Sequence, residues 1–252
     1  MTNEQLKRSM RPILVTGAGG GIGSALVDHL LSHGYPCVMG QYKTRSDKLE
    51  AVLTKHDLDP IRHSFSGNMA ADDDVGRLYD RFQREFGAPW GIINLAGASF
   101  NGMSWKTSSE QFMDTFEANV LTTFNVCKQF IPGMREANSG RIINASSIVG
   151  FTGAVGAASY CAAKAAVVGL TKSLALELAP KNITANVLGL GYFDCGLIEQ
   201  VPPTMQEEIK ARTPAKRFGN VDEIGGLVRF LLSDESAFTT GQVLHMNGGL
   251  YL

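Results

Sequence analysis

Short runs of apolar residues alternate along this chain with longer segments in which apolar and polar positions follow a helical period, and glycines stand at the junctions. The apolar runs have the length of strands and contain few charges, as strands buried on both faces do. Strands that alternate with helices are typical of βαβ units. The pattern predicts an α/β fold in which a seven-stranded, mostly parallel sheet is flanked by helices on both faces.

The elements can be placed on the sequence with few exceptions. Six of the strands are predicted at residues 12–17, 36–42, 90–97, 140–147, 183–190 and 242–247. Helices are predicted at about residues 23–34, 71–87, 108–137, 159–180 and 221–232. No internal repeat and no linker interrupts this order, so we expect a single domain over residues 1–252. Prolines and glycines break the rhythm at about residues 192–215, which we expect to form a less regular insertion.

Composition and charge narrow the class of protein. Hydrophobic residues make up 44% of the 252 positions and charged residues 19%, which fits a globular protein with a sizeable core. A formal net charge of −1 argues against a nucleic-acid-binding protein that relies on a broad basic surface. The four cysteines lie far apart with no CxxC pair, so we predict reduced thiols and neither a metal site nor a disulfide framework.

The same sequence gives no indication of a membrane. The stretch MTNEQLKRSMRP at the start has no apolar region of the kind found in a signal peptide. No run of residues approaches the roughly 18 uninterrupted apolar residues of a membrane span. We therefore expect no membrane association and a cytoplasmic location.

A glycine-rich loop, TGAGGGIG at Thr16–Gly23, lies between the first strand and the first helix. Gly17, Gly21 and Gly23 allow a tight turn, a close approach of the backbone to a pyrophosphate, and close packing of helix on strand. The phosphates would lie at the helix N-terminus, where backbone N–H groups face an anion. Glycines also serve ordinary turns, but the position between strand and helix favours nucleotide binding.

Further motifs extend this pattern along the chain. They are NLAG at Asn94–Gly97, Asn119 in the next helical segment, Ser147 at the end of a strand, and the Tyr-x-x-x-Lys pair Tyr160 and Lys164. In order and spacing the motifs resemble the short-chain dehydrogenase/reductase family, whose fold is a single Rossmann-type, doubly wound α/β domain. The segment TGQVLHMNGG at residues 240–249 is similar to that of 3-oxoacyl-[acyl-carrier-protein] reductases.

Each of these residues also has a purely structural explanation. A Tyr-x-x-x-Lys pair can be a packed ring beside a solvated amine, Ser147 can cap a strand end, and Asn119 can bond the backbone of its own helix. Their conjunction with the glycine loop favours catalysis. We therefore predict Asn119, Ser147, Tyr160 and Lys164 as the catalytic residues.

Carbonyl reduction explains why these residue types would be needed. Hydride transfer to a carbonyl leaves an alkoxide that needs an acid, and a phenol with an ordinary pKa of about 10 gives up its proton reluctantly. The ammonium of Lys164, with the positive charge of an oxidised nicotinamide, would lower the pKa of Tyr160. Ser147 would donate to the substrate carbonyl. The resemblance implies that Lys164 also binds the nicotinamide ribose and that Asn119 holds a water linking Lys164 to solvent.

The end of the second strand bears on the choice between NAD and NADP. An acidic residue there would bind the ribose 2′-hydroxyl of NAD, and none occurs before Asp47. Lys43 and Arg45, with Thr44 and Ser46, could instead neutralise and bond a 2′-phosphate, although an ordinary solvated loop can carry the same residues. We therefore expect NADP, as NADPH, to be the cofactor.

Several residues depart from the family pattern. Asn68 stands where the family has an aspartate that contacts adenine, and its amide can still donate and accept. Leu190 replaces a proline before Gly191, which we expect to loosen the turn. Cys195 replaces a threonine that contacts the cofactor, and an inert side chain is favoured over a reactive thiol. The residues expected to contact the cofactor are Thr16, Gly17, Gly19, Gly21, Ile22, Gly23, Tyr42, Lys43, Thr44, Arg45, Asn68, Met69, Asn94, Ala96, Gly97, Tyr160, Lys164, Gly191 and Phe193.

The resemblance implies a 3-oxoacyl thioester on an acyl carrier protein as the substrate, in fatty-acid, polyketide or polyene-type biosynthesis. Such an enzyme needs basic surface for an acidic carrier, and Arg135, Arg141 and Lys181 are the candidates. The insertion at about 192–215 would act as a lid over an acyl chain. Two alternatives stay open: an alcohol dehydrogenase or ketone reductase acting on a free small molecule, and a non-catalytic scaffold that binds NADPH.

The resemblance also implies a homotetramer. In the family, the long helices that correspond to residues 108–137 and 158–180 pair across a two-fold axis. The small residues of SYCAAKAAVVGL would allow such helices to approach closely, and the final GGLYL would pack at a subunit contact or form a free tail.

Overall fold

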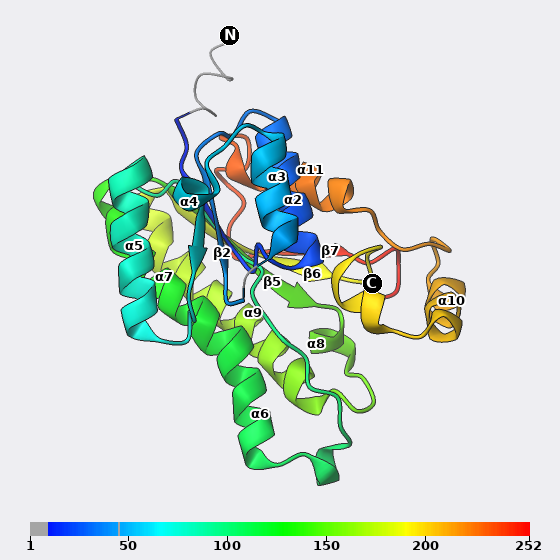
Figure 1. Cartoon of the computed structure of the whole chain (residues 1–252). Coiled ribbons are helices and arrows are strands. Elements are labelled where there is room, and N and C mark those ends of the chain that lie inside the picture. The colour runs from blue at the N-terminus through cyan, green and yellow to red at the C-terminus, as the bar shows by residue number, and fades with distance from the viewer. Residues whose placement is uncertain (1–9, 45) are drawn as a thin grey trace.

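One parallel sheet organises the chain (Figure 1). The computed structural model describes residues 10–44 and 46–252, and the seven strands found there are ordered β3-β2-β1-β4-β5-β6-β7, with every neighbouring pair parallel. The strands are β1 Ile13–Thr16, β2 Val38–Tyr42, β3 Ser64–Ser66, β4 Gly91–Asn94, β5 Gly140–Ser147, β6 Ile183–Leu190 and β7 Val243–Met246. The predicted fold class is confirmed, and the sheet is parallel throughout these strands.

Helices connect successive strands. The α-helices are α2 Gly21–Ser32, α3 Asp47–Lys55, α4 Pro60–His63, α5 Asp72–Phe86, α6 Ser109–Phe116, α7 Thr122–Glu136, α8 Val149–Thr152, α9 Ala158–Leu178, α10 Pro203–Arg212 and α11 Val221–Leu232. Short 3₁₀ turns occur at η1 Ser104–Lys106, η3 Ala179–Lys181 and η4 Gly196–Gln200, and η2 Glu117–Leu121 is a π-helical turn. Among these elements, no helix has both the length and the apolar character needed to cross a bilayer.

Alternate side chains of the strands enter two separate cores. Ile13 and Val15 of β1 pack with residues of α2, α3 and α11, whereas Leu14 packs with residues of α5, α7 and α9. Figure 1 shows these two helical layers on opposite sides of the sheet. Because both faces are covered, the strands read as nearly continuous apolar runs.

Three features differ from the expectation drawn from the sequence. The third strand was not placed, because β3 is only three residues long and two of them are serines. Helices α3 and α4 were not predicted between β2 and β3. The stretch at 108–137 is not one helix, because η2 joins α6 to α7. Single π turns often mark functional sites, and this one carries Asn119.

The expected insertion at about 192–215 contains η4 and α10 rather than irregular chain alone. No side chain of α10 is buried, whereas Ile198 of η4 packs inward. Figure 1 shows α10 at the periphery of the molecule, away from the helical layers. The insertion is therefore attached to the fold through η4 more than through α10.

The strand order opens a crevice beside β1. The chain goes from β1 to β2 and β3 on one side, and then places β4 on the other side of β1. The connections that leave the carboxyl ends of β1 and β4 therefore diverge, and ligands of open α/β sheets bind at such a point. Thr16 ends β1 opposite Asn94 of β4, so the glycine loop and the NLAG segment begin side by side.

Candidate functional site

A large cleft lies at the carboxyl ends of the strands. Its volume is about 1210 Å³, and it runs from the glycine loop, past the ends of β4 and β5, to η4 and the first turns of α9. It includes most of the residues expected to act at the site. These are Gly17, Gly19, Gly21, Ile22, Gly23, Lys43, Asn68, Met69, Ala96, Gly97, Ser147, Tyr160, Lys164, Gly191 and Phe193.

The glycine loop is shaped to receive an anion. Gly17 has a φ of +68°, and a Cβ at this position would lie 2.7 Å from the backbone nitrogen of Ala96, so only glycine fits there. Helix α2 begins at Gly21 with no side-chain cap and no acidic residue in its first turn. Its first N–H groups and the positive end of its dipole are therefore available to a phosphate.

The end of β2 meets this loop through a residue that the sequence analysis missed. Gln41 is buried, its Oε1 accepts from the backbone N–H of Gly17 at 3.3 Å, and its Nε2 donates to the carbonyl of Gly67 at 2.8 Å. Gln41 therefore holds the glycine loop against the ends of β2 and β3. A glutamine inside a strand gives no sequence signal for this role.

The residues expected to bind a 2′-phosphate follow β2 in the sequence. Lys43 is exposed and lines the cleft, and so does Lys48 of α3, which was not predicted. Thr44 is exposed and does not line the cleft, and Tyr42 packs against the core beneath the loop. Arg45 lies outside the described residues.

Asn68 and Met69 line the cleft beside β3. The backbone N–H of Asn68 donates to Asp74 Oδ2 at 2.6 Å, and its own Oδ1 accepts from the N–H of Ala70 at 3.3 Å. The donated N–H, followed by the side chain of Arg77, holds the pKa of Asp74 below its usual value. This turn keeps Asn68 at the edge of the cleft.

Thr16 and Asn94 support the site from beneath rather than line it. Both are buried, and the Thr16 hydroxyl donates to Asn94 Oδ1 at 3.4 Å and accepts from the N–H of Ala96 at 3.3 Å. Asn94 Nδ2 donates to Asn144 Oδ1 at 2.8 Å. The network ties β1, β4 and β5 together beneath the cleft, and cofactor contact by these two residues stays a prediction.

Lys164 is buried at the floor of the cleft. Its Nζ donates to the carbonyl of Ala145 at 3.0 Å and lies 5.5 Å from the centre of the Tyr160 ring. Burial lowers the pKa of Lys164 to about 8. The hydroxyl of Ser146 donates to the Lys164 carbonyl at 2.8 Å, which anchors this turn of α9 against β5.

The phenol of Tyr160 differs from the expectation. Burial, followed by the neighbouring Cys161 and Tyr192, raises the pKa of Tyr160 to about 12. We expected Lys164 to lower this pKa, but the amine is not among the groups that shift it. The protein groups alone keep the phenol protonated, which is the form that an acid in carbonyl reduction requires.

Asn119 holds an unsatisfied oxygen next to these groups. Its Nδ2 donates to the carbonyls of Ala98 at 2.7 Å and Thr115 at 2.8 Å, whereas its buried Oδ1 has no partner among the described residues. A Cβ on Gly97 would collide with that oxygen and would lie 3.3 Å from Lys164 Nζ. A buried oxygen facing an amine across such a gap fits a bridging water.

Ser147 closes β5 at the edge of the cleft. Its oxygen accepts from the N–H of Val149 at 3.4 Å, a long bond that leaves the hydroxyl hydrogen available to donate. Ser147, Tyr160, Lys164 and Asn119 thus gather around one end of the cleft, and the glycine loop lies at the other. The donor set fits a nicotinamide dinucleotide that spans the two.

The residues at the end of β6 keep the backbone contacts of the sheet. Leu190 is the buried last residue of β6, its carbonyl accepts from the N–H of Ile148 at 2.9 Å, and the Gly191 N–H donates to Met246 at 2.8 Å. Leu190 continues the strand and packs in the core, and the looser turn stays a prediction. Burial raises the pKa of Cys195 to about 11, which fits an inert thiol.

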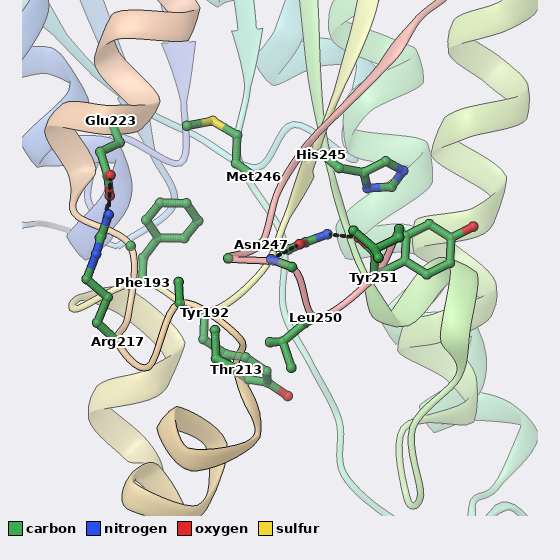
Figure 2. A pocket seen from close by; sticks show the side chains of 15 residues that line it. Tyr192, Phe193, Thr213, Arg217, Glu223, His245, Met246, Asn247, Leu250 and Tyr251 are labelled. Carbon is green, nitrogen blue, oxygen red and sulfur yellow. Dashed lines mark hydrogen bonds and ion pairs between the residues drawn. The ribbon is translucent and has the colours of Figure 1, made fainter.

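A second cavity of about 560 Å³ lies behind the loop that follows β6 (Figure 2). Tyr192 and Phe193 line both this cavity and the cleft. Figure 2 shows His245 and Tyr251 packed together on one side, and Arg217 paired with Glu223 on the other. The final residues Leu250–Leu252 form part of its wall.

One candidate for carrier docking is not available. Arg141 is buried, its Nε and Nη2 donate to the carbonyl of Ser233 at 3.3 Å, and its guanidinium lies 4.8 Å from the centre of the Trp90 ring. It caps the end of α11 and cannot meet a partner protein. Arg135 is exposed and Lys181 is half-buried.

Known proteins similar to this one match nearly the whole chain. A family model described as Enoyl-(Acyl carrier protein) reductase matches residues 17–251. Nodulation protein G of Rhizobium sp. is 34% identical over 95% of this chain and 96% of its own length. Proteins named 3-oxoacyl-[acyl-carrier-protein] reductase FabG, from Staphylococcus epidermidis and Staphylococcus aureus, are each 33% identical over 95% of this chain, and over 98% and 97% of their own lengths.

Proposed function

The chain belongs to the short-chain dehydrogenase/reductase family, and from that premise we propose that it is an NADPH-dependent reductase of 3-oxoacyl thioesters carried on an acyl carrier protein. Membership makes it an oxidoreductase with a nicotinamide cofactor. The product would be the 3-hydroxyacyl thioester, in fatty-acid, polyketide or polyene-type biosynthesis. Relatives that cover the full chain and carry the name of this reductase support the proposal.

One observation carries the catalytic part of the proposal. The buried amine of Lys164, the protonated phenol of Tyr160 and the unsatisfied Oδ1 of Asn119 meet at one end of a cleft that begins at the glycine loop. A buried amine and an orphaned buried oxygen both cost stability. A scaffold that only binds a nucleotide has no need of either, so the arrangement favours catalysis.

Each residue then has a defined task. When bound, the reduced nicotinamide supplies the hydride to the substrate carbonyl. The Ser147 hydroxyl donates to the carbonyl oxygen and holds it where negative charge develops. The Tyr160 phenol gives its proton to that oxygen, and the Lys164 ammonium stabilises the phenolate that remains. Asn119 Oδ1 accepts a hydrogen bond from the water that returns a proton toward Lys164.

The preference for NADPH rests on charge. Lys43 and Lys48 line the nucleotide end of the cleft, and no acidic residue occurs in Val38–Thr44, the end of β2 and the residues that follow it. Cations at this position suit a 2′-phosphate, whereas a carboxylate would suit a free 2′-hydroxyl. A second candidate function, reduction of a free ketone or oxidation of a free alcohol, uses the same groups and differs only in the substrate.

The partners and setting follow from the same proposal. An acyl carrier protein would be the substrate-bearing partner, a homotetramer the assembly, and the cytoplasm the location. The four cysteines are all free, as the cytoplasmic proposal requires.

The test compares thioesters and cofactors in one assay. The loss of NADPH absorbance is followed with a short 3-oxoacyl group, first on a small soluble thiol and then on an acyl carrier protein, and both series are repeated with NADH. We expect a higher kcat/KM with NADPH and with the carrier. Equal rates with both thioesters would favour the free-molecule reductase, and binding of NADPH without turnover of any carbonyl would leave only the scaffold.

A further inference from the structure

A glutamate of the insertion reaches into the nucleotide end of the cleft. Glu199 Oε1 accepts from the backbone N–H of Gly196 at 3.0 Å, and Oε2 lies 3.5 Å from the Nζ of Lys48. The donated N–H, followed by the charge of Lys48, holds the pKa of Glu199 below its usual value. All three residues line the cleft, so a charged carboxylate joins η4 to α3 across it.

The same carboxylate faces the start of α2. A Cβ on Gly21, the first residue of that helix, would lie 2.6 Å from the nitrogen of Gly196 and 3.2 Å from Glu199 Oε1. The helix has no side-chain cap and no acidic residue in its own first turn. Glu199 therefore brings a negative charge to the positive end of the α2 dipole, from a segment 178 positions away in the sequence.

The donors around Glu199 are those that bind phosphate oxygens. An ammonium, a backbone N–H and an open helix N-terminus together form the usual surroundings of a phosphate group. The carboxylate uses two of them directly and lies against the third. η4 and the carboxylate lie beside Gly21, at the helix end where a pyrophosphate in the glycine loop would bind.

We propose that Glu199 is an internal competitor for the cofactor's phosphates and thereby sets cofactor affinity. The inference rests on the proposed binding of a nicotinamide dinucleotide in this cleft. Binding requires the Glu199 contacts with Gly196 and Lys48 to break, so only the fraction of molecules with the carboxylate released is competent. Lys48, once released, becomes a ligand for the cofactor instead of a partner for Glu199.

Competition through contact differs from simple repulsion, and this difference defines the test. Glu199→Gln removes the charge, so it relieves the repulsion and the ion pair with Lys48 and leaves only a weaker, neutral hydrogen bond to Gly196. Glu199→Asp keeps the charge but shortens the side chain by one methylene, which withdraws the carboxylate from the N–H of Gly196 and from Lys48. Contact competition therefore predicts tighter cofactor binding for both variants, whereas repulsion predicts it for Glu199→Gln alone.

The experiment is isothermal titration of the full chain with NADPH and, separately, with NADH. The matched control is Glu208→Gln, which makes the same charge change on the exposed face of α10, outside the cleft. We expect Glu199→Gln and Glu199→Asp to lower Kd for both nucleotides by about three- to tenfold, as loss of one exposed ion pair and one charged hydrogen bond implies. Glu208→Gln should stay within about twofold of the parent chain.

Three results would overturn the proposal. The first is an unchanged or raised Kd in Glu199→Gln. The second is a lower Kd in Glu199→Gln with an unchanged Kd in Glu199→Asp, which would leave repulsion only. The third is an absence of binding of either nucleotide in every variant, which would also remove the proposed cofactor. Normal binding with no turnover would count against the proposed reaction but not against the role of Glu199.

Discussion

Lys164 and Tyr160 show how burial decides the chemistry of single residues. Desolvation lowers the pKa of the amine to about 8 and raises that of the phenol to about 12, so each is pushed toward its neutral form. The protonated phenol suits reduction of a carbonyl. The reverse reaction needs a phenolate, and the positive charge of the oxidised cofactor is the expected source of its stabilisation.

The proposed reacting residues stand in local sequence motifs, whereas several residues that support the site do not. Ser147, Tyr160 and Lys164 stand in local motifs at strand ends and helix starts, so their positions follow from the fold. Thr16 and Asn94 stand in equally clear motifs but turn into the network between the strands. Gln41, Lys48 and Glu199 were missed because their roles arise from contacts between distant segments, which no local pattern reports.

The buried amine predicts how stability depends on pH. Between pH 8 and 10.5 the unfolded chain holds a proton on Lys164 that the folded chain has lost, so this residue makes the free energy of unfolding rise with pH. The full change would be about 3 kcal/mol. We expect the difference between the parent chain and Lys164→Met to shift by this order between pH 7 and 10, measured by urea unfolding.

The exposed Lys172 of the same helix provides the control for that measurement. Lys172→Met should run parallel to the parent chain across the pH range. A difference between the parent chain and Lys164→Met that stays constant from pH 7 to 10 would contradict the assignment of a desolvated amine.

A substitution at Gly97 tests whether the gap between Asn119 and Lys164 is needed for turnover. An alanine would collide with Asn119 Oδ1 and approach Lys164 Nζ, so we expect Gly97→Ala to lower kcat by about tenfold to a hundredfold. Gly76→Ala in α5 is the matched control, because a Cβ there meets nothing within 4 Å. Steady-state rates of the two variants give the comparison, and equal rates would show that the gap plays no part in turnover.

At the scale of elements, the packing of α2 on α11 includes one polar contact beside their shared apolar core. The His29 Nδ1 lies 2.9 Å from Asp222 Oδ1, and its Nε2 accepts from Arg229 Nε at 3.2 Å. These two partners, both on α11, hold the ring over Gly225. The periodicity of α2 and α11 predicted both helices correctly, but it could not show that a histidine would be the contact between them.

We expect alanine substitutions at two adjacent glycines of α11 to have opposite effects on the free energy of unfolding. A Cβ on Gly225 would collide with the His29 ring, so Gly225→Ala should lower the free energy of unfolding by about 1–3 kcal/mol. A Cβ on Gly226 meets nothing within 4 Å, so Gly226→Ala should raise it by about 0.5–1 kcal/mol through helix propensity. Denaturant unfolding measures both, and a Gly225→Ala variant as stable as Gly226→Ala would be inconsistent with this packing.

At the scale of the molecule, a parallel sheet covered on both faces could be expected from the βαβ pattern, whereas the break in the helical stretch at 108–137 could not. The π turn η2 results from one local change in hydrogen bonding that leaves the polar and apolar pattern intact. Asn119 is the buried residue of this turn. The surface of the same stretch carries four exposed large apolar side chains, namely Phe112, Met113, Leu121 and Phe124.

These side chains give the proposed tetramer a test. Exposed apolar residues gathered on one stretch are typical of a subunit contact, so we expect Leu121→Glu with Phe124→Glu to reduce the mass measured by light scattering. Ile61→Glu, at an exposed apolar position on α4, should leave the mass unchanged. A monomeric parent chain, or a mass unaffected by the double substitution, would contradict the assembly.

The most direct test of the central claim is the turnover of Tyr160→Phe with NADPH and a carrier-linked 3-oxoacyl thioester, together with its Kd for NADPH. The substitution removes one hydroxyl and keeps the packed ring. The account predicts a kcat lower by about a hundredfold to ten-thousandfold, with NADPH bound about as tightly as by the parent chain. Unchanged turnover, in a folded variant with normal NADPH affinity, would contradict the role of Tyr160 as the acid.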